Sequence, residues 1–328
     1  MTRRIIGLLA TFVLAIIVVP LAADSPAEHV RRIGVLSWGV PPSAAARERW
    51  PLLQGLRELG WIEGQNMAIE ERYAEFHLDR VPDLVADLVR LKVDVIVAIS
   101  GPASRAAKQA TSTIPIVVQV GNAIEQGLVT NLARPEGNIT GVSMMTPDLS
   151  QKRLELLQEA VPELSRVAVL WCPEYAGNPA LRNPLQAAAH ALGVELQSIE
   201  ARDPDDLDAG FKAALRHSAQ ALVVFECTLF APWRRRIVDF AAESGLPAMY
   251  GMRTFVEAGG LMAYAANWPE AGRRLAAYVD KILKGIKPTD LPIEQPTTFE
   301  LVINLKTAQA LGLTIPPTLR FQATEVIR

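Results

Sequence analysis

The chain is poor in cysteine, histidine and aromatic residues and carries almost no net charge. Two cysteines in 328 residues are too few for a disulfide framework, although a single bond is compatible with an oxidising compartment. The four histidines, His29, His77, His190 and His217, lack the spacing of a metal site. A net charge of −2 is not the basic footprint of a nucleic-acid-binding protein. Disulfide-stapled, zinc-dependent and nucleic-acid-binding classes are therefore unfavoured.

Sequence motifs of the common enzyme classes are missing as well. There is no dinucleotide fingerprint, phosphate-binding loop, zinc-protease helix or nucleophile elbow. The acidic run Asp203–Asp208 lacks the central glycine and the distal glutamate of a calcium loop. We interpret Asp203 as an ordinary helix N-cap. The sequence thus predicts no metal, no cofactor and no enzymatic activity.

The longest hydrophobic run lies at the N-terminus and favours export. Two arginines precede the apolar stretch Ile5–Val19, and Pro20 and small residues follow it. This is the layout of a secretory signal peptide, and we assign residues 1–27 to it, with cleavage after Ala23 as the second choice. An uncleaved anchor is the alternative, since residues 5–23 just reach spanning length. No cysteine stands at either cut, so we expect a periplasmic protein that is not a lipoprotein.

The remaining residues alternate between short apolar runs and amphipathic segments, which predicts alternating strands and helices. Expected strands are 32–38, 67–73, 93–99, 114–120, 139–144, 166–171, 194–199, 221–225, 247–250, 260–265 and 299–304. Expected helices are 50–59, 81–91, 100–109, 125–132, 149–161, 184–192, 207–217, 232–243, 254–258, 269–283 and 305–311. Uninterrupted apolar strands separated by helices predict an α/β fold with two doubly wound parallel-sheet lobes.

The order of these elements also predicts the domain organisation. We expect lobe 1 over residues 31–146, lobe 2 over 147–266, and a C-terminal segment, 267–328, that crosses back and completes lobe 1 in part. The interlobe crossings are expected near 146–149, 265–269 and 287–296. Several crossings would make a hinge rather than a simple linker.

Candidate binding residues follow from the ends of the predicted strands, because ligands of open α/β sheets bind outside the carboxyl ends of the strands. These ends are rich in hydroxyls, glycines and aromatic rings and poor in acid–base pairs, which is typical of binding rather than catalysis. The candidates are Ser37, Trp38, Ser100, Gly101, Pro102, Ala103, Gly121, Asn122 and Ser143 in lobe 1, and Trp171, Cys172, Glu226, Cys227, Tyr250 and Met252 in lobe 2. We expect Trp38 and Trp171 to face one another across the mouth of the cleft.

Long blocks of sequence also resemble a known family. The blocks are 55–66, 107–116, 132–141, 152–157, 255–262 and 294–308. They are similar to the ABC-transporter substrate-binding proteins whose members include tryptophan- and tyrosine-type binders. The resemblance implies a type I periplasmic binding fold that delivers a small solute to an inner-membrane permease.

Three departures from the family bear on the ligand. Members commonly have Gly-Asp-Pro where this chain has Gly121-Asn122-Ala123, an Asp near the position of Cys227, and an Asn at that of Cys172. Such groups suit an amino-acid ammonium, and without them Glu226 is the obvious acidic substitute. The expected function is that of a monomeric, exported solute-binding protein of an ABC importer, for an amino-acid-like or aromatic ligand. A periplasmic sensing module and an enzyme in the same cleft are the alternatives.

The two cysteines end the first and third predicted strands of lobe 2, and these strands are neighbours in the doubly wound order. Neighbouring strands lie about 4.8 Å apart, so we expect Cys172 and Cys227 to lie close together. A disulfide and a pair of reduced thiols both remain open.

Overall fold

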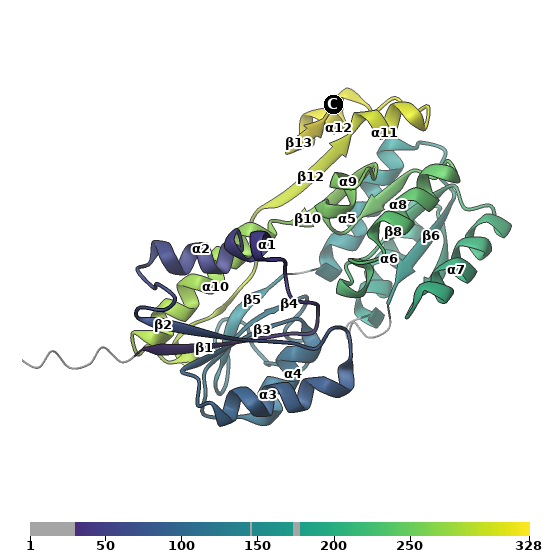
Figure 1. Cartoon of the computed structure of the whole chain (residues 1–328). Helices are drawn as coiled ribbons and strands as arrows, with labels where there is room; N and C mark the ends of the chain where they lie inside the picture. The colour runs from purple at the N-terminus through teal and green to yellow at the C-terminus, as the bar shows by residue number, and fades with distance from the viewer. Residues whose placement is uncertain (1–29, 145, 173–177) are drawn as a thin grey trace, which may run out of the picture.

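The structure is a computed structural model that describes residues 30–144, 146–172 and 178–328. The predicted signal peptide lies outside these residues. Within the described part of the chain, no helix has the length and apolar character needed to cross a membrane. The molecule consists of two α/β lobes joined side by side (Figure 1).

Lobe 1 is built on a six-stranded parallel sheet with the order β11-β5-β4-β3-β1-β2. Its strands are β1 (Arg31–Ser37), β2 (Met67–Tyr73), β3 (Val95–Ile99), β4 (Ile116–Val120), β5 (Ile139–Ser143) and β11 (Ile293–Glu294). Its helices are α1 (Ala44–Glu48), α2 (Pro51–Glu58), α3 (Val81–Arg90), α4 (Gly101–Ala110) and α10 (Trp268–Leu283), with short 3-10 helices at Leu78–Arg80 and Pro288–Asp290.

One face of this sheet is covered by α2 together with α10, which arrives from much later in the chain. Apolar side chains of both helices pack on the central strands, as shown by the buried Leu56, Leu275, Val35 and Val97. The two helices approach so closely that a Cβ on Gly55 would lie 2.7 Å from the Cβ of Ala276. Glycine at this position therefore allows α10 to complete lobe 1.

Lobe 2 is built on a seven-stranded sheet with the order β13-β12-β10-β9-β8-β6-β7. Its strands are β6 (Arg166–Trp171), β7 (Glu195–Glu200), β8 (Ala221–Val224), β9 (Ala248–Tyr250), β10 (Met262–Ala266), β12 (Phe299–Asn304) and β13 (Glu325–Ile327). Its helices are α5 (Thr146–Ala160), α6 (Asn178–Leu192), α7 (Pro204–Arg216), α8 (Arg234–Glu243), α9 (Arg253–Glu257), α11 (Leu305–Ala310) and α12 (Pro317–Gln322), with a 3-10 turn at Thr228–Phe230. All pairs are parallel except β10 with β12.

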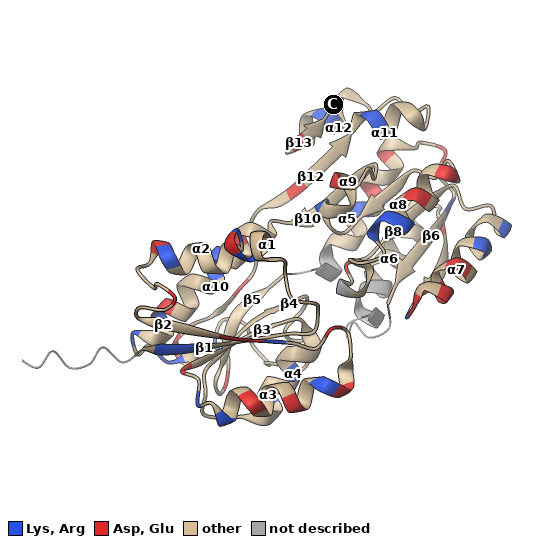
Figure 2. Cartoon of the chain, in the orientation of Figure 1, with Lys and Arg blue, Asp and Glu red and all other residues tan. Residues whose placement is uncertain are grey.

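These sheets confirm the predicted fold class, an α/β protein with two parallel-dominated sheets. In outer helices such as α3 and α7, acidic residues occupy the first turn and basic residues the last (Figure 2). The predicted N-cap at Asp203 is present, since its carboxylate accepts from the backbone N–H groups of Asp205 and Asp206.

The helix predicted at residues 125–132 is wrong. Residues 123–127 form turns instead. The side-chain oxygen of Asn122 accepts from the backbone of Ile124 and Glu125, and Gly127 adopts a φ of 67°. A left-handed residue ends helical hydrogen bonding, so the segment remains a compact loop beyond β4.

The chain passes between the two sheets at three places in the described residues. It passes from β5 to α5, from β10 to α10, and from β11 to β12. The second link is a single residue, Asn267, whose side chain caps α10 by accepting from the backbone N–H of Glu270 at 2.8 Å.

Candidate functional site

The carboxyl ends of the two sheets are held close to one another by the short interlobe links. Strand β5 of lobe 1 ends at Ser143, and α5 of lobe 2 begins at Thr146. Strand β10 of lobe 2 ends at Ala266, and α10 of lobe 1 begins at Trp268. Because each link leaves the carboxyl end of its strand and spans only one or two residues, it places both carboxyl edges at the junction of the lobes. These edges are where open α/β sheets bind ligands.

In lobe 1, a row of side chains crosses the carboxyl edge on the α2 side of the sheet. Ser37 pairs in register with Tyr73 on one side and with Ile99 on the other. A cavity of about 350 Å³ opens beside this row. Its lining residues are Ser37, Pro42, Ala46, Arg49, Trp50, Pro51, Tyr73 and Ile99. Two aromatic rings, an arginine and a hydroxyl thus surround a space suited to a small organic molecule.

Ionic contacts hold the Tyr73 ring of this cavity in place. The Tyr73 hydroxyl donates to Glu71 Oε2 at 2.8 Å, and the same carboxylate accepts from Arg47. Arg47 also donates to both oxygens of Glu63, at 2.9 and 3.0 Å. Burial and the bond to Glu71 raise the pKa of Tyr73, so the phenol keeps its proton and this bond even at pH values above the ordinary tyrosine pKa of about 10.

Of the predicted lobe 1 residues, Ser37 lies in this cavity, and three others build the loop after β4. The Ser143 hydroxyl donates to the Gly121 carbonyl at 3.3 Å and accepts from the Ala123 backbone at 3.2 Å, while Asn122 caps the following turn. Their polar side-chain atoms thus bond to the protein itself. The segment Ser100–Ala103 starts α4 and is buried.

In lobe 2, the predicted Glu226 is already matched by a cation. Arg153 of α5 binds the Glu226 carboxylate with both terminal nitrogens, one of them at 2.8 Å. Arg153 Nε also donates to the Tyr264 carbonyl at 2.7 Å. The Arg153 side chain is fully buried and that of Glu226 is 5 % exposed. Burial raises the pKa of the Glu226 carboxyl, while Arg153 opposes that shift. The structure therefore corrects our expectation that Glu226 is a free partner for a ligand ammonium group.

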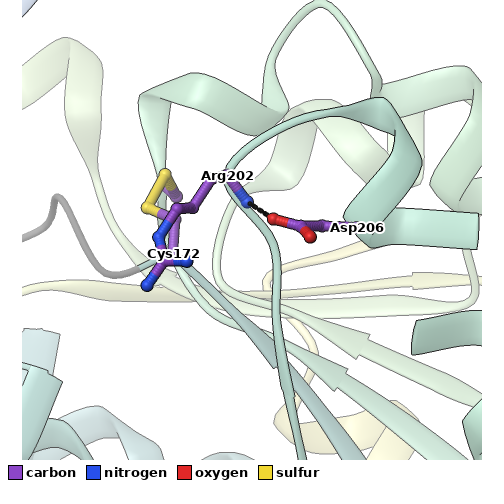
Figure 3. Close-up of a disulfide and its surroundings, with 4 residues drawn as sticks. Cys172, Arg202 and Asp206 are labelled. Carbon is purple, nitrogen blue, oxygen red and sulfur yellow. Dashed lines mark hydrogen bonds between the residues drawn. A yellow bond between two sulfur atoms is a disulfide. The ribbon is translucent and has the colours of Figure 1, made fainter. Parts of the chain in front are cut away.

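The two cysteines form a disulfide, which decides the alternative that the sequence left open. Cys172 directly follows β6 and Cys227 follows β8, and their Cα atoms are 6.3 Å apart. Figure 3 shows the bond beside Arg202, whose backbone N–H donates to Asp206 at 2.9 Å at the start of α7. The bond thus ties together the carboxyl ends of two strands of lobe 2.

The two tryptophans are not presented as open rings. Trp38 is 1 % exposed and meets Phe76 edge-on, with ring centroids 5.6 Å apart. Trp171 is 8 % exposed, and its indole N–H donates to Ser198 Oγ at 2.7 Å. Each ring therefore packs within its own lobe, and the expectation that the two rings face one another across the cleft stays a prediction.

The remaining candidates in lobe 2 lie at the end of β9. Tyr250 is fully buried, and its ring stacks on Phe255 at 5.0 Å. Met252, which is half-buried, precedes α9 as its N-cap residue. Tyr250 thus contributes to packing under α9, and a ligand contact by Met252 stays a prediction.

Sequence reasoning missed the residues that shape the cavity, namely Arg49, Trp50 and Tyr73. Tyr73 had a usable signal, since it is the last residue of a correctly predicted strand, β2. Arg49 and Trp50 precede a helix, and no strand-end pattern indicates them.

Comparison with known proteins agrees with this geometry. The family model described as ABC transporter substrate binding protein matches residues 41–327. The chain belongs to this family. A tyrosine-binding protein of Clostridioides difficile (strain R20291) is 24 % identical over 263 residues, covering 80 % of this chain and 75 % of the relative.

Two solved structures resemble this family member over nearly its whole length. A conserved domain protein of Vibrio cholerae O1 biovar El Tor has a TM-score of 0.84 and 26 % identity, covering 90 % of this chain and 99 % of the other. The ABC domain of Streptococcus pneumoniae in complex with L-Trp has a TM-score of 0.83 and 26 % identity, covering 91 % and 100 %. This substrate-binding protein therefore shares the type I periplasmic binding fold.

Proposed function

We propose that this protein is the exported solute-binding component of an ABC importer. It is secreted to the periplasm by a cleaved signal peptide, is not a lipoprotein, and works as a monomer. It captures a small amino-acid-like or aromatic solute between its lobes by hinge closure and presents the closed form to an inner-membrane permease. No covalent bond of the solute changes.

The observation that carries this proposal is the pair of carboxyl edges joined by short links. A ligand that contacts both edges stabilises the closed arrangement by its differential affinity for that state. Three crossings between the lobes favour rotation of the lobes as rigid bodies. Family membership supports the same conclusion.

The cavity in lobe 1 supports an aromatic or otherwise flat solute. Trp50 and Tyr73 offer ring faces, and Arg49 offers a cation. A volume of about 350 Å³ lies at the small end of organic-ligand sites. The named ligands of two similar proteins, tyrosine and L-Trp, have this shape.

The first experiment is native mass spectrometry of protein exported and purified without refolding. It is followed by thermal-shift screening with amino acids, small aromatic carboxylates and purine-like compounds. A ligand that binds only the folded state raises stability by RT ln(1 + [L]/Kd), so we expect a saturating shift. If no compound in these classes shifts the melting temperature, or if a compound is turned over, the proposal fails.

The cavity is tested by Tyr73→Ala, measured by calorimetric titration with the best compound of the screen. Loss of a ring face should weaken binding by about 1.5–3 kcal/mol, the scale of burying one large side chain. Phe321→Ala is the matched control, because Phe321 is 93 % exposed on α12 of lobe 2. Equal affinities of Tyr73→Ala and Phe321→Ala would show that Tyr73 does not contact the ligand.

A further inference from the structure

A further cavity, of about 280 Å³, lies where the chain passes between the lobes, and we call it the junction cavity. Its walls come from the first two turns of α10, from Glu294 at the end of β11, and from residues 295–297 of the link to β12. Val142, which precedes the last residue of β5, also lines it. The junction cavity shares no lining residue with the cavity beside Tyr73, so the two are separate spaces.

The position of the junction cavity connects it to the relative movement of the lobes. Asn267 is the whole link from β10 to α10 and lines the cavity, as do residues 295–297 of another link. Hydrogen bonds join these two links, because the Asn267 side chain accepts from the Glu270 N–H at 2.8 Å and the Glu270 carboxylate accepts from the Thr298 hydroxyl. A few residues of this kind absorb the backbone changes of a hinge motion. A molecule held between the two links therefore makes different contacts in different arrangements of the lobes.

The charged lining of the junction cavity carries an excess of negative charge. Glu270 and Glu294 supply two carboxylates, and each of these side chains is 35 % exposed. The guanidinium of Arg274 lies 3.9 Å from Glu270 and 3.4 Å from Glu294. Both distances exceed the range of a good hydrogen bond, about 2.7–3.2 Å. Two carboxylates beside one loosely held guanidinium favour the entry of a further cation.

The remaining lining residues set the size and shape of an occupant. Val142, Ala271 and Pro296 form an apolar wall on which a short hydrocarbon chain can pack. A volume of about 280 Å³ lies just below the usual range of organic-ligand sites, so it suits a molecule of few heavy atoms. A primary amine with a short alkyl chain combines a compact cation, several hydrogen-bond donors and an apolar part.

We propose that the junction cavity binds a small primary amine and that its occupancy alters the affinity for the captured solute. The ammonium group lies between Glu270 and Glu294. It takes the place of the Arg274 guanidinium, whose side chain is 53 % exposed and turns outward to solvent. The alkyl chain packs on the apolar wall. The amine site stands by itself, whereas the effect on solute affinity rests on the proposed function.

The direct test titrates butylammonium chloride against sodium chloride at constant ionic strength, with 1-butanol as the uncharged counterpart, and follows the melting temperature. The wild type is compared with Glu294→Gln, Arg274→Gln and the control Glu58→Gln, which changes an exposed glutamate of α2 in the same lobe. We expect Glu294→Gln to weaken amine binding about fivefold, the scale of a partly exposed ion pair. Arg274→Gln should strengthen it, because the competing cation is gone, and Glu58→Gln should match the wild type.

The opposite signs expected for Glu294→Gln and Arg274→Gln distinguish a site from a general effect of the amine on the fold. A stabilisation that is absent, equally large with 1-butanol, or equal in all four proteins overturns the proposal. So does a weaker amine effect in Arg274→Gln. Loss of the effect in Tyr73→Ala would place the amine in the other cavity and would overturn the proposal as well.

The effect on solute capture is measured by calorimetric titration of the best compound of the solute screen, with saturating butylammonium or with sodium chloride of equal ionic strength. Two ligands coupled through one hinge change each other's affinity by the same factor, and we expect a change of about fivefold or more. An unchanged dissociation constant overturns the coupling and leaves the amine site standing. If the screen yields no solute, capture and coupling fall together, and the butylammonium titration still decides the amine site.

Discussion

The carboxyl edges of the two lobes differ in how their polar groups are satisfied. In lobe 1, the start of α4 leaves Ser100, Arg105 and Gln126 unpaired, and a cavity opens beside Tyr73. In lobe 2, Arg153 and Glu226 satisfy one another, and a disulfide joins the strand ends. The same architecture thus yields an edge in lobe 1 where three unpaired groups gather, and an edge in lobe 2 that an ion pair and a disulfide hold together although single groups such as the Tyr250 hydroxyl stay unpaired.

The difference indicates a division of labour between the lobes. An unpaired buried donor costs free energy until a ligand meets it, so such groups belong where binding occurs. A covalent cross-link and a buried ion pair restrict movement, so they suit a lobe whose binding edge keeps its shape during closure. We expect the ligand to dock first on lobe 1.

Loss of Arg153 is the change expected to have the largest effect. Arg153→Met leaves the buried Glu226 without its cation, and breaking a buried pair in this way costs about 3–5 kcal/mol. Chemical denaturation should show this loss, and Lys152→Met, on the partly exposed neighbouring residue, should stay close to the wild type. The double variant Arg153→Met, Glu226→Leu should recover most of the stability. A single variant as stable as the wild type would show that lobe 2 does not depend on this pair.

Loss of the disulfide is expected to rank second. Cys172 and Cys227 are 55 residues apart in sequence, and closing a loop of that length contributes about 2–4 kcal/mol. Reduction, or the double substitution to Ser, should lower the free energy of unfolding by this amount. Thiol titration of the unfolded, unreduced protein should find no free thiol. Two titratable thiols would show that no disulfide distinguishes lobe 2 from lobe 1.

Relief of strain at Ser100, whose φ is 98°, should stabilise lobe 1. Ser100→Gly removes about 1–3 kcal/mol of backbone strain and adds the larger unfolded-state entropy of glycine, for a net gain of about 1 kcal/mol. The control Ser244→Gly, at an ordinary φ of −85°, should lose stability. If Ser100→Gly is destabilised as much as the control, Ser100 is not strained, and backbone strain does not distinguish lobe 1 from lobe 2.

The smallest effect is expected at Tyr250, and it depends on pH. Its hydroxyl is buried without a hydrogen-bond partner among the described residues, so Tyr250→Phe should change stability at pH 7 by no more than about 0.5 kcal/mol. Burial raises the pKa of Tyr250. Above the ordinary tyrosine pKa of about 10, the unfolded chain loses this proton before the folded chain does.

The wild type should therefore lose stability relative to Tyr250→Phe as the pH rises above that value, by about 1.4 kcal/mol per pH unit for one group. Urea denaturation at pH 7, 9 and 11 gives the comparison. Parallel stability curves for the two proteins would show that the phenol is not held protonated by the fold.

Much of the fold could be predicted from local patterns. The apolar run Val167–Trp171 gave the bounds of β6 as the structure has them, because a strand buried on both faces needs no polar alternation. The loop after β4 was predicted as a helix because its apolar residues have helical spacing. Asn122 and Gly127 turn the chain there instead. Strands β11 and β13 contain only two and three residues, too few to produce a pattern.

The candidate site was less accessible to sequence reasoning. Strand ends indicated Ser37, Ser100 and Glu226, but they did not show which polar side-chain atoms already bond to other groups of the protein. Arg153 and Glu226 are 73 residues apart, and nothing in either local sequence indicates their pairing. Arg105 lies in the interior of a predicted helix. In the structure its guanidinium lies beside Gly101 at the start of α4, together with Gln126 from the loop after β4, and no local sequence pattern indicates this arrangement.

The single-residue link at Asn267 has a consequence for how this protein tolerates change in length. Because this one residue both connects the lobes and caps α10, adding or deleting a residue there would rotate the helix by about 100° about its axis. That rotation would turn the buried face of α10 away from the sheet of lobe 1. Insertions are ordinarily tolerated in exposed connections, but an insertion at Asn267 would disturb the packing of α10. Domain fusions and sensor designs that place a reporter between the lobes should therefore avoid this connection. The exposed turn at Gly285, beyond the end of α10, offers an insertion point that leaves the alignment of the lobes unchanged.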